Sequence, residues 1–415
     1  MSTLDSSFSA HADKHLSNVD SQLANKYRGD FGGRQPIHTC YIPADKLHKG
    51  SETEWQELAL SVLKDHAPDA KTLAKAVGLD AAVVAPIYDK VVAKIKREPI
   101  EDLRIDFEDG YGRRGDAEEE KHLQLALEAF PNLTAPFTGI RMKSMESVTR
   151  ARALKTLDQF VSGIVKLGAY PKNFVITLPK VTFVEQVEVM VMACETLEKA
   201  HNLAAGTIRF EIQIETTQSI FGPDGQATAA KMIDATKGRL TAFHYGTYDY
   251  SAAAGVSAAY QTLDHPAADY AKQLLQVVAA GTTVRLSDGS TNILPVGTTD
   301  QVHAAMANHY RLVRRSLERG LYQGWDLHGT QLPTRVLANI IFYREGLQSA
   351  SNRLRTYLER AESGTMDEPA TALVLANYFL RGLDAGAIEA DEIKSLTNQD
   401  EHQLRALVLR KGQIS

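Results

Sequence analysis

Eight short β-rich runs, separated by helical stretches, constrain the fold of this chain more than any other feature. Stretches such as EEEKHLQLALEAF lie between them and carry apolar residues at helical spacing. Strands that alternate with helices are typical of a parallel sheet, and eight strands most economically close into a (β/α)8 TIM barrel. In chain order, the runs are IHTCYIP from Ile37, LRIDFE from Leu103, GIRMKS from Gly139, FVITLPKV from Phe174, IRFEIQIE from Ile208, LTAFHYG from Leu240, TVRLSDG from Thr283 and YQGWDLHG from Tyr322.

An open, doubly wound sheet is the alternative arrangement of the same elements. Such sheets often bind nucleotides through a glycine-rich loop after the first strand. The sequence has no GxGxxG after its first strand run and no GxxxxGK[ST] motif. We therefore expect an α/β fold with a closed barrel.

Three stretches lie outside a minimal barrel, which is expected to span residues 35–335. Residues 51–97 form a helical insertion after the first strand, and residues 336–415 form a helical extension after the last strand. Both are lid candidates, because insertions that follow strands lie on the catalytic face. Residues 1–34 are polar, so we expect either a helix on the outside of the fold or a partly disordered segment.

Composition excludes several classes of protein. The chain of 415 residues has 46 Lys and Arg against 51 Asp and Glu, a formal net charge of -5, so no nucleic-acid partner is expected. The N-terminus lacks the apolar core of a signal peptide, and no apolar run is long enough to cross a membrane. We therefore expect a cytoplasmic protein without a membrane partner. Cys40 and Cys194 lie in apolar runs and are interpreted as buried, inert thiols.

Polar side chains gather where the predicted strands end. Strands of a closed barrel are buried, so charge at their ends requires a reason. Barrel enzymes take their catalytic groups from several strand ends on one face. The candidates are Glu108, Asp109, Arg141, Lys180, Glu215, Asp249, Asp288 and His328.

This set of residues suits a hard cation and an anionic substrate. Glu215 and Asp249 follow neighbouring strands and offer the oxygen ligands that Mg²⁺ prefers, with Mn²⁺ as the alternative ion. A 2-oxo acid could add its carboxylate and keto oxygens, and the cation would then stabilise an enolate. Arg141 could neutralise the same oxygens. We therefore expect a small anionic metabolite as the substrate.

Six short elements together carry a resemblance to a known superfamily. In order, between about Arg34 and about Arg335, they are LRIDFEDG, GIRMKS, LPKV, EIQIETTQSIF, FHYGTYDYSAAAG and GLYQGWDLHGTQL. The ordered set resembles the superfamily of citrate lyase β-subunits, malyl-CoA lyases and HpcH/HpaI aldolases, whose core is shared in outline with malate synthase. The chain departs from the pattern after His328, where Gly stands in place of Pro.

The resemblance implies a TIM barrel, a divalent metal and carbon–carbon chemistry through an enolate. Glu215 and Asp249 match the metal ligands of the superfamily, and Arg141 matches the arginine that contacts the substrate carboxylate and the enolate. Three further catalytic candidates match charged positions beside the metal, and these are Glu108, Asp109 and Lys180.

His328 and Asp288 are assigned with Arg141 to substrate binding. Each candidate could also have a purely structural role, because charged side chains at strand ends can form buried ion pairs. These roles are a buried ion pair with Arg141 or Lys180 for Glu215 and Asp249, and a salt bridge to Glu108 for Arg141. They are a side chain that reaches solvent from a strand end for Lys180, a hydrogen-bonded core residue for His328, and a turn for Asp288. Lys180 could also act as a Schiff-base amine.

The predicted function is that of a carbon–carbon lyase or aldolase acting on a 2-oxo acid aldol or on a 3-hydroxyacyl-CoA. The insertion at residues 51–97 enters the region where CoA-using members bind the nucleotide, so a CoA thioester stays an open alternative. A malate-synthase-like condensation and a non-catalytic barrel used as a binding module also stay open. So does a phosphoryl-transfer barrel, although the sequence shows no phosphorylatable histidine loop.

The resemblance also implies closure and assembly. Members of the superfamily close their sites with a C-terminal segment, often across a subunit interface. We therefore expect the region after about Thr334 to cover the catalytic face of its own barrel or of a neighbour's, in a homo-oligomer that is most simply a trimer or hexamer. An acidic residue of this region could act as the general base, with Asp384, Glu389, Asp391 and Glu392 as candidates.

Overall fold

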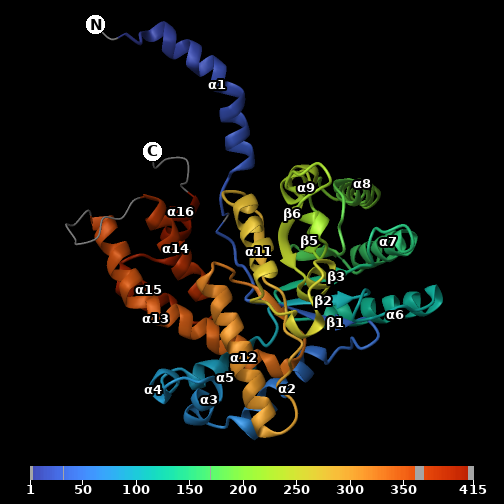
Figure 1. The fold of residues 1–415 in the computed structure, drawn as a ribbon, viewed down its shortest axis with the longest axis vertical. Coiled ribbons are helices and arrows are strands. Elements are labelled where there is room, and N and C mark those ends of the chain that lie inside the picture. Colours follow the sequence, from blue (N-terminus) through green and yellow to red (C-terminus); the bar gives the residue numbers. More distant parts are fainter. Residues whose placement is uncertain (1–2, 31, 169, 360–368, 410–415) are drawn as a thin grey trace.

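Eight parallel strands curve into the predicted barrel (Figure 1). The structure, a computed structural model, describes residues 3–30, 32–168, 170–359 and 369–409. The neighbour order is β7-β6-β5-β4-β3-β2-β1-β8, and a parallel bridge between Ser287 and Gln323 brings the two outer strands together. The strands are β1 His38–Pro43, β2 Asp102–Asp106, β3 Phe137–Arg141, β4 Phe174–Leu178, β5 Arg209–Ile214, β6 Leu240–Tyr245, β7 Arg285–Ser287 and β8 Gly324–Asp326.

Helices alternate with these strands and cover the outside of the barrel. Apolar side chains of both kinds of element form the main core between them. In the described part of the chain, no helix has the length and apolarity needed to cross a membrane. The barrel helices are α6 Asp116–Ala129, α7 Arg150–Lys166, α8 Val184–Ala200, α9 Thr228–Ala235, α10 Thr247–Ala253, α11 Pro266–Ala279, α12 Thr299–Glu318 and α13 Leu332–Glu359, with short 3-10 turns η1 Phe130–Asn132, η2 Thr217–Ser219, η3 Ala258–Tyr260 and η4 Gly329–Gln331.

The inside of the barrel is charged rather than apolar. Side chains alternate along a strand, and Arg104 of β2 meets Glu211 of β5 inside the barrel, with Nη2 and Oε2 2.9 Å apart. Arg104 also pairs with Asp102. Gly139 makes room for this arrangement, because a Cβ there would lie 1.8 Å from the Val175 carbonyl oxygen and 3.1 Å from Cδ of Arg104.

A buried network around Asp326 joins the last strand to the first. Asp326 lies 2.7 Å from Nδ1 of His38 and 3.1 Å from Nε2 of His309, and it pairs with Arg335 at 2.9 Å. The other ring nitrogen of His309 lies 2.7 Å from the Thr334 hydroxyl. The network therefore ties β1, β8, α12 and α13 together at the closure of the barrel.

The insertion after β1 is helical, as predicted, and it reaches the catalytic end of the barrel. Gly329 of η4 lies so close to α2 that a Cβ there would be 2.6 Å from the Trp55 carbonyl oxygen. The helices of the insertion are α2 Ser51–His66, α3 Ala70–Val77, α4 Ala81–Val84 and α5 Tyr88–Arg97.

The C-terminal extension is also helical, but its described part does not cover the catalytic end of its own barrel. Its helices α14 Pro369–Asp384, α15 Ala390–Thr397 and α16 Glu401–Leu409 lie beside α13 (Figure 1). Arg381 of α14 pairs with Asp30 at 3.1 Å, and Arg405 of α16 donates to the Gly32 carbonyl. Residues 32–34 lead into the N-terminal end of β1, so the extension packs towards the opposite end of the barrel.

A lid over the chain's own barrel was therefore a wrong prediction for the described residues, whereas a lid over a neighbour's barrel stays a prediction. Three of the four proposed bases of this region also have other partners. Glu389 pairs with Lys90 at 2.6 Å, Glu392 pairs with Arg344 at 3.1 Å, and Asp384 lies 3.5 Å from Arg405.

The N-terminal segment forms α1 Ser6–Lys26, which projects from the body (Figure 1). Asp5 caps its start by accepting hydrogen bonds from the amides of Ser7 and Phe8, each at 3.0 Å. Lys26 pairs with Asp234 of α9 at 2.7 Å where the helix meets the body. The described residues of α1 include no buried side chain, so this helix does not pack on the outside of its own barrel.

Candidate metal and substrate site

A cavity of about 630 Å³ opens at the C-terminal ends of the strands. Its floor contains Tyr41 and Trp325, whose rings lie 5.0 Å apart. Its rim contains residues of the insertion helix α2, namely Ser51, Glu54, Trp55 and Leu58. Charged and polar side chains from the predicted set also line it, and these are Asp109, Arg141, Glu215, Asp249 and His328.

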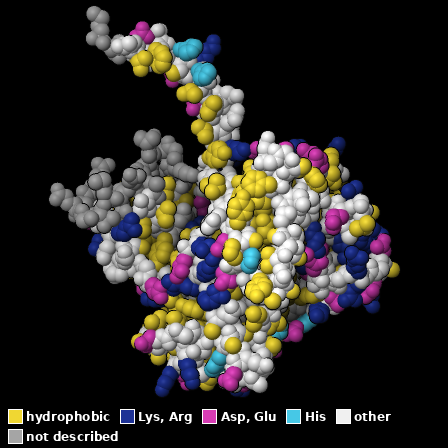
Figure 2. All heavy atoms as spheres, in the orientation of Figure 1, with side chains coloured by type: hydrophobic (Ala, Val, Ile, Leu, Met, Phe, Trp, Pro, Cys, Tyr) yellow, Lys and Arg dark blue, Asp and Glu magenta, His cyan; other side chains and the backbone are white. Residues whose placement is uncertain are grey.

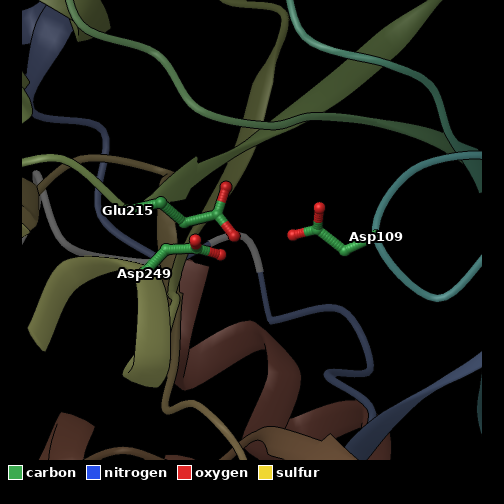
Figure 3. Close-up of side chains that lie close together, drawn as sticks. All are labelled: Asp109, Glu215 and Asp249. Carbon is green, nitrogen blue, oxygen red and sulfur yellow. The ribbon is translucent and has the colours of Figure 1, made fainter. Parts of the chain in front are cut away.

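Three carboxylates meet on one side of this cavity (Figure 3). Glu215 follows β5, Asp249 lies in α10 after β6, and Asp109 lies in the loop after β2. Each offers one oxygen, and these oxygens all lie within 4.8 Å of one another. The structure thus brings the two predicted metal ligands together and adds Asp109, which the sequence placed beside them. Three hard oxygen donors suit Mg²⁺ or Mn²⁺.

Burial and the repulsion between neighbouring carboxylates oppose the ionised forms of Glu215 and Asp249. Burial raises the pKa of Glu215 to about 8, and the negative charges of Glu108 and Asp249 act in the same direction. Burial also raises the pKa of Asp249, and nearby Asp109 adds to this effect, although Lys180 opposes it. A bound divalent cation would favour the ionised form of all three ligands. The donor set therefore fits a metal ion.

Gly246 allows Glu215 to occupy its position. A Cβ on Gly246 would lie 2.3 Å from Cγ of Glu215 and 3.0 Å from its Oε1. A larger residue would therefore displace the carboxylate or the strand end. The glycine follows β6 directly, so the turn that carries Asp249 also shapes the space for Glu215.

Lys180 links the carboxylates of two strands. Its Nζ lies 2.7 Å from Glu108 and 2.7 Å from Asp109, and its amide donates to Oε2 of Glu215 at 2.9 Å. Burial works against its charge, but the two acidic partners outweigh burial and raise the pKa of Lys180. Its φ of 53° is left-handed, a conformation that costs energy in a residue with a side chain and is concentrated at functional sites.

Asp106 is a site residue that the sequence reasoning missed. Its carboxylate accepts two hydrogen bonds from Arg141, Nε to Oδ1 and Nη2 to Oδ2, each at 2.6 Å. It also accepts from the amides of Glu108 at 2.9 Å and Gly110 at 2.8 Å. Burial opposes the positive charge of Arg141, but Asp106 outweighs it and raises the pKa of the guanidinium.

Asp106 therefore fixes both Arg141 and the turn that presents Asp109. Asp106 is the first aspartate of LRIDFEDG and lies inside the predicted strand, at a position whose side chain alternates towards the barrel interior. The sequence reasoning considered the charged residues at the strand end, Glu108 and Asp109, and passed over Asp106. Arg141 also lies over the ring of Tyr41, with 4.6 Å from Cζ to the ring centroid, and its Nη1 lies 3.6 Å from Glu108.

His328 and Asp288, both assigned to substrate binding, have different surroundings. His328 lines the cavity, and burial lowers its pKa, so its ring is neutral near pH 7. Asp288 is buried and does not line the cavity; Lys272 donates to it at 3.0 Å and Ser316 donates to it at 2.5 Å. This carboxylate is already bound by buried partners, so we do not retain a substrate contact for Asp288.

Comparison with known protein families shows which family the chain belongs to. A model of the family described as "Domain of unknown function (DUF6986)" matches residues 16–412, nearly the whole sequence. The chain belongs to this family. No curated protein sequence matches the DUF6986 chain at a significant level.

Solved structures with a similar fold include metal-bound and CoA-bound proteins. The magnesium/glyoxylate complex of Haloferax volcanii malate synthase has a TM-score of 0.48 and 14% identity, covering 90% of this chain and 97% of that chain. Mycobacterium tuberculosis CitE in complex with magnesium, acetoacetate and coenzyme A has a TM-score of 0.48 and 15% identity, covering 86% and 99%. A Burkholderia cenocepacia protein of the HpcH/HpaI aldolase/citrate lyase family has a TM-score of 0.38 and 13% identity, covering 80% and 98%.

Proposed function

We propose that this DUF6986 protein is a divalent-metal-dependent carbon–carbon lyase that cleaves a 2-oxo acid aldol through an enolate. One observation carries the proposal: Asp109, Glu215 and Asp249 offer oxygens within 4.8 Å of one another on a cavity that Arg141 also lines. A hard cation and a fixed guanidinium on one small cavity are the groups that a 2-oxo acid and its enolate require. The resemblance of six ordered sequence elements to citrate lyase-like and aldolase families supports the same reaction.

The residues of the chain have distinct parts in this proposal. When bound, a divalent cation would supply the positive charge that stabilises an enolate. Asp109, Glu215 and Asp249 would hold it, and Lys180 would hold Glu108 and Asp109 in place through its contacts at 2.7 Å. Arg141, oriented by Asp106, would offer Nη1 to the carboxylate of the substrate.

Cleavage of the aldol also needs proton transfers. A base takes the proton of the substrate hydroxyl, the carbon–carbon bond breaks to give an aldehyde and an enolate, and the enolate then takes a proton to give the second product. Half-buried His328 lines the cavity and has a lowered pKa, so its neutral ring can accept a proton. We propose His328 as the group that carries this proton.

The insertion helix α2 favours a free acid over a CoA thioester in this proposal. Trp55 and Leu58 of α2 occupy the rim of the cavity, which has a volume of about 630 Å³. A nucleotide-bearing substrate would have to pass this rim, whereas an aldol of a small 2-oxo acid would fit within the cavity.

A screen of 4-hydroxy-2-oxo acids and 3-hydroxyacyl-CoA thioesters for release of the 2-oxo acid or acyl-CoA product tests the proposal. Activity should require Mg²⁺ or Mn²⁺, disappear with EDTA, and be lost in Glu215→Ala while the circular dichroism spectrum stays unchanged. Mn²⁺ binding, followed by the loss of the free-ion electron paramagnetic resonance signal, separates metal binding from turnover. A chain that binds Mn²⁺ but cleaves none of these substrates would point instead to condensation or to a non-catalytic binding role.

A further inference from the structure

The helix α1 presents an apolar stripe to solvent along its whole length. Figure 1 shows it projecting from the body, and Figure 2 shows hydrophobic side chains along it. At about 100° per residue, the stripe falls within an arc of about 100° on one face. Leu23 is 52% exposed and Leu16 is 45% exposed. The full stripe consists of Phe8, Ala12, Leu16, Val19 and Leu23 within the helix and of Tyr27, the residue that follows its last turn.

A helix in this situation needs a partner. Helices in proteins gain most of their stability from packing an apolar face against other elements, because short helices are only marginally stable by themselves in water. The sequence SSFSAHADKHLSNVDSQLANK contains many Ser, Asp and Asn residues, which have weak helix propensity. The described residues of α1 include none that is buried in this chain. The contacts that stabilise the helix must therefore come from outside the described part of the chain.

The spacing of the stripe points to a second copy of the same helix. Successive apolar positions are separated by 4, 4, 3, 4 and 4 residues, and this pattern reads the same from either end. Two antiparallel copies would therefore place Leu16 opposite Val19, Ala12 opposite Leu23 and Phe8 opposite Tyr27, and each contact would occur twice. Such a self-complementary surface is the requirement for a two-fold contact.

The expected contact area sets the strength of the association. The 21 residues of α1 extend over about 30 Å. Five side chains that are each about half exposed on both helices would bury on the order of 1,000 Å² in total, near the lower end of specific interfaces.

We propose that α1 is a dimerisation element that pairs antiparallel with α1 of a second copy of this chain. This contact gives a dimer, or a hexamer when combined with a three-fold axis, but not a closed trimer.

Analytical ultracentrifugation of the full chain across a wide concentration range tests the proposal. Leu16→Asp/Leu23→Asp places two charges in the stripe and should weaken the association by about 100-fold or more. The variant should then sediment as a particle of half the wild-type mass. Ser17→Asp/Ser21→Asp places the same charges on the opposite face and should retain the wild-type assembly. Both variants should keep the barrel folded, which circular dichroism and thermal unfolding would check, because α1 has no buried residue.

Cysteine cross-linking tests the direction of the pair. The two native cysteines, Cys40 and Cys194, are both 0% exposed and will not compete. A mixture of Leu16→Cys and Val19→Cys chains should form a disulfide dimer faster than either variant by itself. Faster cross-linking of each variant with itself would show a parallel pair and overturn the proposal.

Three further outcomes would also overturn it. The wild-type chain could be monomeric at every concentration, or the stripe variant could keep the wild-type mass. Alternatively, the monomer could co-sediment with phosphatidylglycerol vesicles in a manner that Leu16→Asp/Leu23→Asp abolishes, in which case the stripe binds a lipid surface.

Discussion

Asp106 holds the guanidinium of Arg141 through two hydrogen bonds of 2.6 Å, so this side chain is oriented before any ligand arrives. A charge that is already in place needs little reorganisation when an anion develops beside it. The same carboxylate accepts hydrogen bonds from two backbone amides of the turn that contains Asp109. Asp106 thus links the orientation of the Arg141 guanidinium to the position of Asp109, a candidate metal ligand.

Replacement of Arg141 by lysine should be far from silent. Lysine keeps the charge but cannot make the paired hydrogen bonds to Asp106, so it should lose its fixed orientation. We expect catalytic efficiency to fall by about 100-fold or more, with Mn²⁺ affinity changed much less. Steady-state kinetics on the substrate found in the screen would measure this effect, and turnover close to wild type would remove Arg141 from the mechanism.

A methyl group at Gly110 should disturb the same turn. The Cβ of Gly110→Ala would lie 2.5 Å from Oδ2 of Asp106, so the turn or the carboxylate must shift. We expect a loss of about 1–3 kcal/mol in the free energy of unfolding, measured by urea denaturation. Gly115→Ala is the matched control, because its Cβ meets no described atom within 4 Å, and it should cost much less. Equal costs for both variants would contradict this account of the turn.

The contact between α2 and η4 sets the position of the insertion helix over the cavity. Trp55 and Leu58 face η4 so closely that Gly329 has no room for a side chain. Because Trp55 and Trp325 both line the cavity and are the two tryptophans of the chain, their fluorescence reports on this contact.

Gly329→Ala should therefore move α2 and change the tryptophan emission spectrum. Its Cβ would lie 2.6 Å from the Trp55 carbonyl oxygen and 2.9 Å from Cβ of Leu58, and backbone atoms cannot easily give way. We expect a loss of about 1–3 kcal/mol in unfolding free energy. An unchanged emission maximum together with unchanged stability would show that α2 does not depend on this contact.

The network that joins β8 to β1 should make stability depend on pH. Burial lowers the pKa of His309 in the folded chain, although the hydrogen bond to Asp326 opposes this effect. The unfolded chain then binds the proton more tightly. The stability that neutral His309 contributes is complete above about pH 6.5 and decreases as the pH falls towards the folded pKa, by up to about 1.4 kcal/mol per pH unit.

Urea denaturation above and below pH 6.5 would measure this dependence. His309→Gln should flatten the pH dependence, whereas His11→Gln, at an exposed position of α1, should leave it as in the wild type. If His309→Gln and the wild type lose stability equally on acidification, His309 is not the group responsible.

At the scale of the whole molecule, the barrel could be predicted from the sequence because strand periodicity is local. Each of the eight β-rich runs overlaps a strand, and motif order placed Glu215 and Asp249 at adjacent strand ends. Their assignment as metal ligands stays a prediction. The position of the C-terminal extension could not be predicted in this way, because pairs such as Arg381 with Asp30 join residues far apart in the chain.

Asp106 and the projection of α1 were missed for related reasons. Asp106 resembles an ordinary strand residue until its partner 35 positions away is known to lie beside it. The amphipathic pattern of α1 predicts a helix with a buried face, but the pattern by itself does not say which surface covers that face.

A divalent cation held by Asp109, Glu215 and Asp249 is the central claim, and anomalous diffraction from crystals soaked in Mn²⁺ tests it most directly. We expect one anomalous peak within about 2.5 Å of a carboxylate oxygen from each of the three residues, and no such peak in Glu215→Ala crystals soaked in the same way. A wild-type map without a peak between these three carboxylates, or with its peak elsewhere, would contradict the account.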